Sequence, residues 1–195
     1  MKNSLIFAFL LCCTSLFSHP HSFIVNQYKF YVSNSGLDKI GIVWHLDEMF
    51  SESVMFDIDK NKNRKIDEDE RERVYSDAFM NTKNYNYFLD LKIGNKTVKI
   101  DSVSNFYASY EENVLIYEFE VSMPQAYKTL NLPIRIFSYD PTYYVLIEPD
   151  PKTGVQIIKP KKQEIVFEMI KKNYDFKNYG KLPVSGVELY VFPEN

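Results

Sequence analysis

The chain alternates apolar and polar residues along most of its length, and this pattern predicts a mostly antiparallel β-protein. It begins with two alternating runs, FIVNQYKFYV and DKIGIVWHL, which are separated by the turn-forming sequence SNSG. Two such runs joined by a short turn predict a β-hairpin. If the hairpin turns near Gly36, Ile24 faces Glu48 and Val25 faces Asp47.

Helical periodicity follows the hairpin. Apolar residues recur at helical spacing over residues 47–58 and again over 67–82, which predicts a pair of helices. Short strand patterns then continue at residues 87–100, 105–121, 133–139, 143–149, 163–170 and 186–192. We therefore expect an α+β fold, in which antiparallel β-sandwich-like sheets carry an EF-hand-like helix–loop–helix inserted at about 47–82.

The first eighteen residues have the pattern of an export signal. Lys2 supplies a positive start, and the apolar run LIFAFLL is too short to span a bilayer. Cleavage after Ser15 and cleavage after Ser18 both fit, and the second makes His19 the mature N-terminus. A lipoprotein cut before Cys13 fits less well. We expect an exported, periplasmic protein with a signal at residues 1–18 and a single metal-binding domain at 19–195.

Composition narrows the chemistry of that domain. Its formal net charge is −3 before the signal is removed, so neither nucleic acid nor an anionic membrane surface is a natural partner. No second apolar run is long enough to cross a membrane. Both cysteines, Cys12 and Cys13, lie inside the signal. A metal in the mature chain must therefore be held by imidazole, carboxylate, carbonyl or the terminal amine.

The sequence DKNKNRKIDEDE, between the two predicted helices, has the spacing of an EF-hand calcium loop. Arg64 occupies the sixth position, where the loop needs a positive φ and usually has glycine. Only three carboxylates remain, so we expect weak binding of Ca²⁺ in a structural role; the alternative is a charged turn that binds no ion. The expected oxygen donors are Asp59, Asn61, Asn63, the Lys65 carbonyl, Asp67 and Glu70.

Two of the three histidines flank Pro20, directly after the signal. In an extended chain His19 and His21 point to the same side, and the proline favours an extended backbone before it. His45 and Asp47 share a face if the second strand extends that far. Imidazoles beside a carboxylate are the ligands that Zn²⁺ and Ni²⁺ prefer. The alternatives are a solvated His-Pro-His pair and an Asp47 that caps the first helix.

The ordered sequences HPHSF, VWHLDEMFS, the acidic loop and YDPTYYV resemble a family of bacterial periplasmic proteins. That family is labelled as the periplasmic component of an uncharacterised ABC-type transport system, and its better-understood member is the zinc-binding protein ZevA. The resemblance covers most of residues 19–150. It implies a metal-binding partner of a membrane metal transporter of the nickel/cobalt or zinc type.

Carried over by position, the resemblance points to one set of residues, although His45 departs from the aromatic or aliphatic residue expected before the LDE sequence. This set is His19, His21, Asp47, Glu48, Asp140, Tyr143 and Tyr144. The sequence DPT also has an ordinary interpretation as a turn, and paired tyrosines are common in strands.

Three functions therefore compete. The first is a non-enzymatic protein that binds Zn²⁺ or Ni²⁺ for a membrane transporter. The second is a Ca²⁺-stabilised extracytoplasmic scaffold in which the histidines are incidental. The third is a copper enzyme that uses an N-terminal His19. Hydrolysis is not favoured, since the mature chain has neither a cysteine nucleophile nor a Gly-x-Ser-x-Gly turn.

Overall fold

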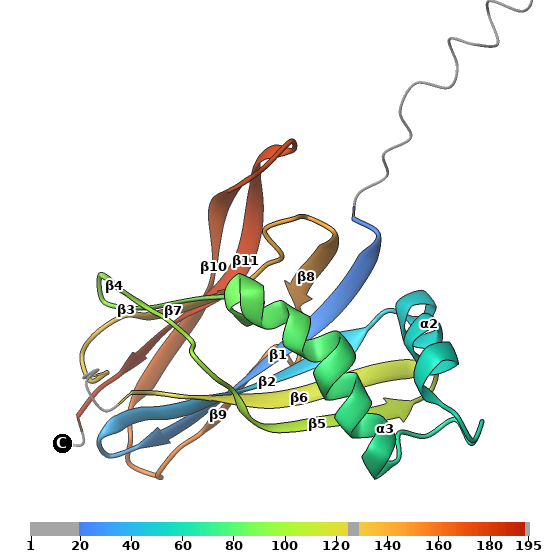
Figure 1. The fold of residues 1–195 in the computed structure, drawn as a ribbon. Coiled ribbons are helices and arrows are strands. Elements are labelled where there is room, and N and C mark those ends of the chain that lie inside the picture. The colour runs from blue at the N-terminus through green and yellow to red at the C-terminus, as the bar shows by residue number, and fades with distance from the viewer. Residues whose placement is uncertain (1–19, 125–128, 194–195) are drawn as a thin grey trace, which may run out of the picture.

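The computed structural model describes residues 20–124 and 129–193, which form two β-sheets and one helical segment (Figure 1). We name the sheets A and B. Sheet A has the strand order β5-β6-β2-β1-β8, with β9 also paired to β1, and sheet B has the order β10-β11-β7-β3-β4. The strands of sheet A are β1 (Ser22–Ser33), β2 (Gly36–Leu46), β5 (Ser104–Glu111), β6 (Val114–Ser122), β8 (Val145–Pro149) and β9 (Val155–Ile158). Those of sheet B are β3 (Leu89–Ile93), β4 (Lys96–Val98), β7 (Ile134–Ser138), β10 (Ile165–Phe176) and β11 (Gly180–Val191).

The first hairpin forms as predicted, but its register differs by two residues. Ile24 lies opposite Leu46 and Val25 opposite His45, rather than opposite Glu48 and Asp47. The difference has two causes: the turn is centred before the glycine, since Ser33 lies opposite Gly36, and an irregularity between Tyr31 and Val32 shifts the register back by one residue.

A helix–loop–helix follows β2, as the periodicity predicts. Helix α2 (Glu48–Ile58) leads into the acidic loop and then into α3 (Glu68–Arg73). From there the chain continues through a π-helical turn, η2 (Val74–Ala78), and a 3-10 segment, η3 (Phe79–Phe88). No helix among the described residues combines the length and apolar character needed to cross a bilayer.

The sandwich is mixed rather than wholly antiparallel. β8 and β9 both pair in parallel with β1, one after the other along the same edge. The alternation of residues predicts that strands exist, but it carries no information on which distant strand lies beside which. The remaining strand pairs are antiparallel, as expected.

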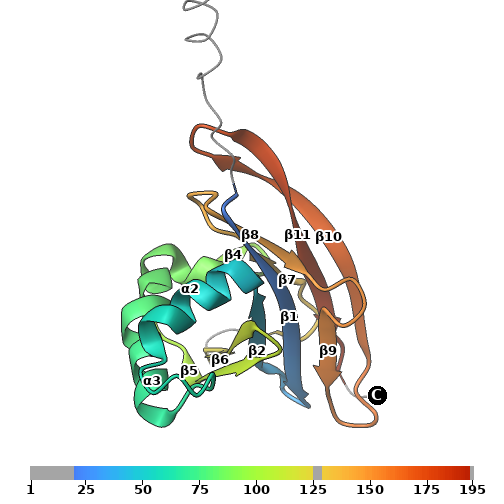
Figure 2. The ribbon, with the colours of Figure 1, turned by 90° about the vertical axis from the view of Figure 1, so that its right-hand side faces the viewer.

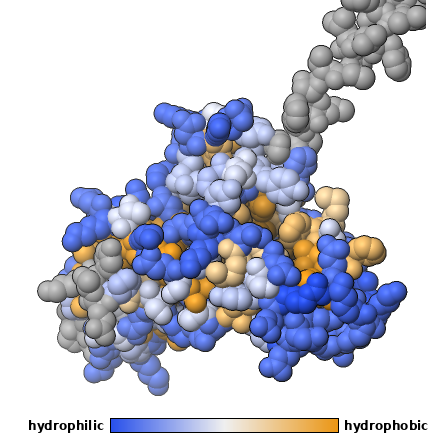
Figure 3. Space-filling view, in the orientation of Figure 1, coloured by the Kyte–Doolittle hydropathy of each residue, from blue (hydrophilic) through white to orange (hydrophobic). Residues whose placement is uncertain are grey.

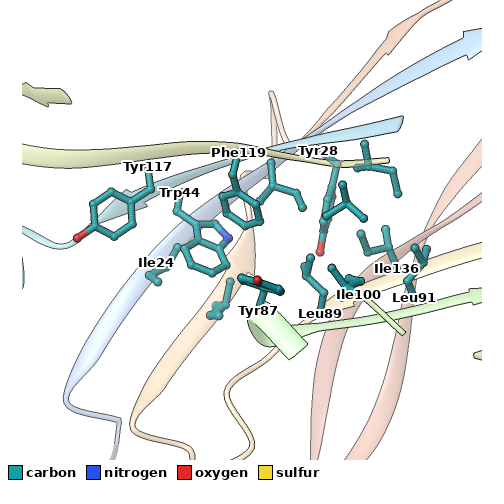
Figure 4. Packing of buried hydrophobic residues seen from close by; sticks show 14 of the residues in the cluster. Ile24, Tyr28, Trp44, Tyr87, Leu89, Leu91, Ile100, Tyr117, Phe119 and Ile136 are labelled. Atoms are coloured by element: carbon teal, nitrogen blue, oxygen red, sulfur yellow. The ribbon is translucent and has the colours of Figure 1, made fainter. Parts of the chain in front are cut away.

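One face of sheet A is buried, and two different layers cover it (Figure 2). At one end the helical segment packs on β2 and β6, where Phe79 contacts Trp44 and Phe119 with ring centroids 6.1 and 4.9 Å apart. At the other end sheet B covers β1, and the Tyr28 hydroxyl lies 2.8 Å from the Ser138 hydroxyl of β7. Figure 4 shows both halves of this core as one continuous cluster.

Gly186 lies where β11 and β7 of sheet B leave no room for a side chain. A Cβ at this position would clash with the Phe137 ring and lie 2.5 Å from the Ile136 carbonyl oxygen. Gly186→Ala should lower the free energy of unfolding by about 2–3 kcal/mol, measured by urea denaturation. Gly180→Ala is the control, since its Cβ meets no atom within 4 Å and only its positive φ opposes it. Equal losses in the two variants would contradict this account.

Candidate metal-binding site

The beginning of β1 is the place where three of the sequence motifs meet. The backbone N–H groups of His21 and Ser22 both donate to the Tyr144 carbonyl, at 2.9 and 3.3 Å. On the other side, the Asp47 N–H donates to the Phe23 carbonyl at 2.9 Å. HPHSF therefore lies between LDE, which begins α2, and DPTYY, which leads into β8.

Asp47 joins the start of β1 to the start of α2. Its Oδ2 accepts hydrogen bonds from the Ser22 hydroxyl at 2.7 Å and the Phe23 N–H at 2.8 Å. Its Oδ1 caps the helix by accepting from the Phe50 N–H at 2.9 Å. Partial burial raises the pKa of this carboxyl, but the hydrogen bonds outweigh it and hold the pKa below its ordinary value. The capping alternative noted from the sequence is therefore confirmed.

Asp140 has a similar structural role in the loop before β8. The side chain is 3% exposed, and its oxygens accept from the backbone N–H groups of Thr142, Tyr144 and Val145 at 2.8, 3.1 and 3.1 Å. The Thr142 hydroxyl donates to the same carboxylate at 2.8 Å. These bonds fix the loop in the conformation that presents the Tyr144 carbonyl to His21.

The side chain of His21 is exposed, and its ring centroid lies 5.1 Å from that of Tyr144. His19 lies outside the described residues. Tyr143 points elsewhere: with a φ of 59° it turns its ring toward Phe176 and Tyr179, at centroid distances of 5.0 and 5.1 Å. Of the two tyrosines in DPTYY, Tyr144 is the one that hydrogen-bonds to residues 21 and 22 of the N-terminal motif.

His45 and Glu48 lie beside this junction, on the outer side of sheet A. They line an open hollow of about 600 Å³ together with Phe23, Val25 and Asp47. Glu48 is exposed and His45 half-buried. Asp47 stays extended directly after β2, with φ −62° and ψ 156°, and it lines the same hollow as His45, so the two residues share a side of the sheet as predicted.

The described residues do not assemble the full ligand set suggested by the sequence. Across residues 20–124 and 129–193, no three or more His, Cys, Asp or Glu side chains are grouped so that they could hold a metal ion. Asp47 and Asp140 already accept several hydrogen bonds each, and a metal would have to compete with those donors. Their geometry suits positioning of the N-terminal segment better than ligation. Sequence reasoning missed Ser22 and the Tyr144 carbonyl, because neither is a typical metal ligand.

The acidic loop between α2 and α3 is closed by hydrogen bonds to its own carboxylates. Arg64 has a φ of 56° at the sixth position. Asp59 accepts the N–H groups of Asn63 and Arg64 at 3.1 and 2.9 Å, which closes the first half of the loop. Glu70 is 3% exposed, and its two oxygens accept the N–H groups of Lys60 and Asp67, each at 3.0 Å.

Arg64 also explains how the loop tolerates a residue other than glycine at that position. Its guanidinium forms an ion pair with Glu52 of α2 at 2.6 Å. It also donates to the Tyr110 hydroxyl and the Asn113 side chain, at 2.7 and 2.9 Å. These contacts tie the loop to α2 and to the β5–β6 hairpin, and they offset part of the strain of a positive φ.

The junction at Asp47 gives a pH-dependent prediction. Because the folded-state pKa is lowered, the stabilising contribution of Asp47 is complete above the ordinary aspartate pKa of about 4 and is lost as the pH falls further, through the lower folded-state pKa. Asp47→Asn should lower the free energy of unfolding by about 1–2 kcal/mol at pH 7. By urea denaturation, the difference in free energy of unfolding between wild type and variant should shrink as the pH is lowered from 7 to 3.

The control is Asp57→Asn, which changes an exposed carboxylate of the same helix. It should alter stability little at either pH. If the difference in free energy of unfolding between wild type and Asp47→Asn stays constant from pH 7 to pH 3, the charge of Asp47 does not stabilise the fold.

Comparison with known proteins supports a bacterial family. Residues 4–177 match the family described as "Protein of unknown function (DUF1007)". An "Uncharacterized protein" of Haemophilus influenzae (strain ATCC 51907 / DSM 11121 / KW20 / Rd) is 26% identical over 157 residues, which cover 80% of this chain and 74% of that protein. An "Uncharacterized 15.5 kDa protein in trpE 3'region" of Spirochaeta aurantia is 29% identical over 91 residues, 47% of this chain and 64% of that protein. Because the family match spans most of the sequence, the chain belongs to the DUF1007 family.

Proposed function

We propose that this protein binds Zn²⁺ or Ni²⁺ in the periplasm and works with a membrane metal transporter. One observation supports this most directly. The sequences HPHSF, LDE and DPTYY are far apart in the chain, yet hydrogen bonds join them around the segment that carries His21. A histidine-bearing terminus that needed no defined position would gain nothing from such a junction.

In this proposal the ligands and the positioning residues are different groups. His19 and His21 supply imidazole, which suits Zn²⁺ and Ni²⁺. Asp47 and Asp140 hold the backbone on either side of them through the hydrogen bonds described above. Glu48, which is exposed at the same end of sheet A, is the carboxylate best suited to add an oxygen. If the signal is cut after Ser18, the terminal amine adds a further donor.

A site of this kind suits transfer better than storage. His21 lies at the surface, so a bound ion keeps positions open to ligands from another protein. Such an ion can be passed on without opening the fold. The role is therefore binding and delivery, and it requires no catalytic step.

The test is a zinc and nickel titration by calorimetry, on protein whose N-terminus has been established by mass. His19→Ala/His21→Ala should weaken binding at least about tenfold and leave the fold intact. Binding to wild type should also weaken in acid, because protons compete with the metal for both imidazoles. His45→Ala is the matched control, since it removes a histidine outside the N-terminal motif. Titrations of the double variant that match wild type would exclude this function.

A second candidate is a Ca²⁺-stabilised extracytoplasmic scaffold, and the acidic loop favours it. The loop lies between two helices, has a positive φ at its sixth position, and turns the carboxylate of Glu70 inward. These are the features that a calcium-binding EF-hand loop needs. With Asn61 and Asn63 in place of carboxylates, the expected affinity is that of extracellular modules, with a Kd of about 1 mM.

Thermal unfolding with added Ca²⁺ tests the second candidate. At about 10 mM Ca²⁺ and a Kd of about 1 mM, mass action should add about 1.4 kcal/mol to the free energy of unfolding. That corresponds to a rise in Tm of about 3–6 °C. Glu70→Gln should remove the rise, whereas Glu72→Gln, on the same helix but outside the loop, should keep it. A Tm that Ca²⁺ leaves unchanged in wild type would exclude the calcium function.

A further inference from the structure

β10 forms one edge of sheet B. Its twelve residues pair with β11 from end to end, from Ile165 opposite Val191 to Phe176 opposite Gly180. No other strand of the described residues pairs with the opposite edge of β10. Backbone N–H and C=O groups along that edge are therefore available to a further strand. Figure 1 shows β10 at the margin of the sheet, with the end of its hairpin projecting beyond the rest of the fold.

The same strand exposes apolar side chains in a short run. Val166, Phe167 and Met169 are 53%, 45% and 51% exposed. Phe167 and Met169 lie opposite Leu189 and Val187, which are fully buried core residues, so all four share one face of the sheet. The core-facing surface of sheet B thus continues past its covering layer onto β10. An exposed apolar edge of this length is a template for strand addition.

A competing apolar surface lies on α2. Met49 and Phe56 are 73% and 88% exposed, and Figure 3 shows apolar surface on the right-hand side, where α2 lies. These side chains belong to a helix whose backbone hydrogen bonds are already made. β10 differs because it offers both apolar side chains and backbone groups that can pair.

We propose that β10 pairs with β10 of a second copy of this chain, antiparallel and centred on Ile170, so that the two B sheets become one continuous sheet. A two-fold axis through Ile170 places each residue opposite the one at the same distance on the other side of Ile170. Glu168 then faces Lys172 of the second copy, and the symmetry makes this ion pair twice. The sequence of the strand is therefore complementary to itself in charge.

Lys172 is the cation of this contact, and it also has partners within its own chain. Its Nζ lies 3.0 Å from Asp90 Oδ2 and 4.2 Å from the centre of the Tyr174 ring, while its side chain remains 40% exposed. In the dimer this partly exposed side chain turns from Asp90 to Glu168 of the second copy and so exchanges one carboxylate partner for another. Centring the pair on Glu168 instead would place two like charges directly opposite each other, which is unfavourable.

Sedimentation velocity over a range of protein concentrations tests the proposal, with circular dichroism to confirm folding. Wild type should self-associate into a dimer. Glu168→Lys should raise the dissociation constant at least about tenfold, because two attractive pairs become repulsive. It should not harm the fold, since Glu168 lies opposite Glu188 of β11 and the new lysine faces that carboxylate.

Two controls separate this interface from others. Glu164→Lys makes the same change of charge just before the strand, where no cation faces it in this register, and should leave the dissociation constant unchanged. Phe56→Lys removes the most exposed apolar side chain of α2 and should also leave the dimer intact. A monomeric wild type, equal losses for Glu168→Lys and Glu164→Lys, or dissociation by Phe56→Lys alone would each overturn the proposal.

Discussion

The fold depends on β1 being paired along both edges. β2 occupies one edge, and β8 and β9 share the other in parallel. A strand fixed on both sides cannot slip, because a shift of one residue would turn Tyr28 and Phe30 from the core to solvent. Both covering layers of the core rest on the sheet that β1 organises, and the N-terminal motif is the direct extension of this strand. The position of His21 therefore follows from a strand that is fixed along both edges.

Local features of this fold could be predicted from the sequence because they depend on residues close together in the chain. The hairpin at Gly94, the hairpin that turns after Glu111 and the limits of α2 all follow from turn chemistry and periodicity. The parallel pairing of β8 with β1 could not be predicted, since it joins residues more than a hundred positions apart. The same holds for the register of the first hairpin, where a small displacement of the turn near Gly36 moves every partner along β2.

The candidate site could also be predicted only in part. Sequence reasoning identified the motifs that meet at the start of β1, but it left Asp47 open between a metal ligand and a helix cap, and Asp140 open between a ligand and a turn residue. A carboxylate suited to a metal is equally suited to several N–H groups, and only the surrounding backbone decides between the two. Asp140 accepts three backbone N–H groups of its own loop, which a sequence pattern cannot show. Asp47 could be interpreted in both ways in advance, since a helix pattern begins directly after it.

This use of carboxylates changes what the N-terminal motif requires. If Asp47 and Asp140 hold the backbone, the chemistry of binding falls on side chains that extend beyond the junction, His21 and the residues before it. The hydrogen bonds made by Phe23 and Tyr144 define the position of the backbone at His21, and the His21 side chain extends from there into solvent. Rigid support with open coordination is the arrangement expected of a protein that must bind an ion and then release it to another site.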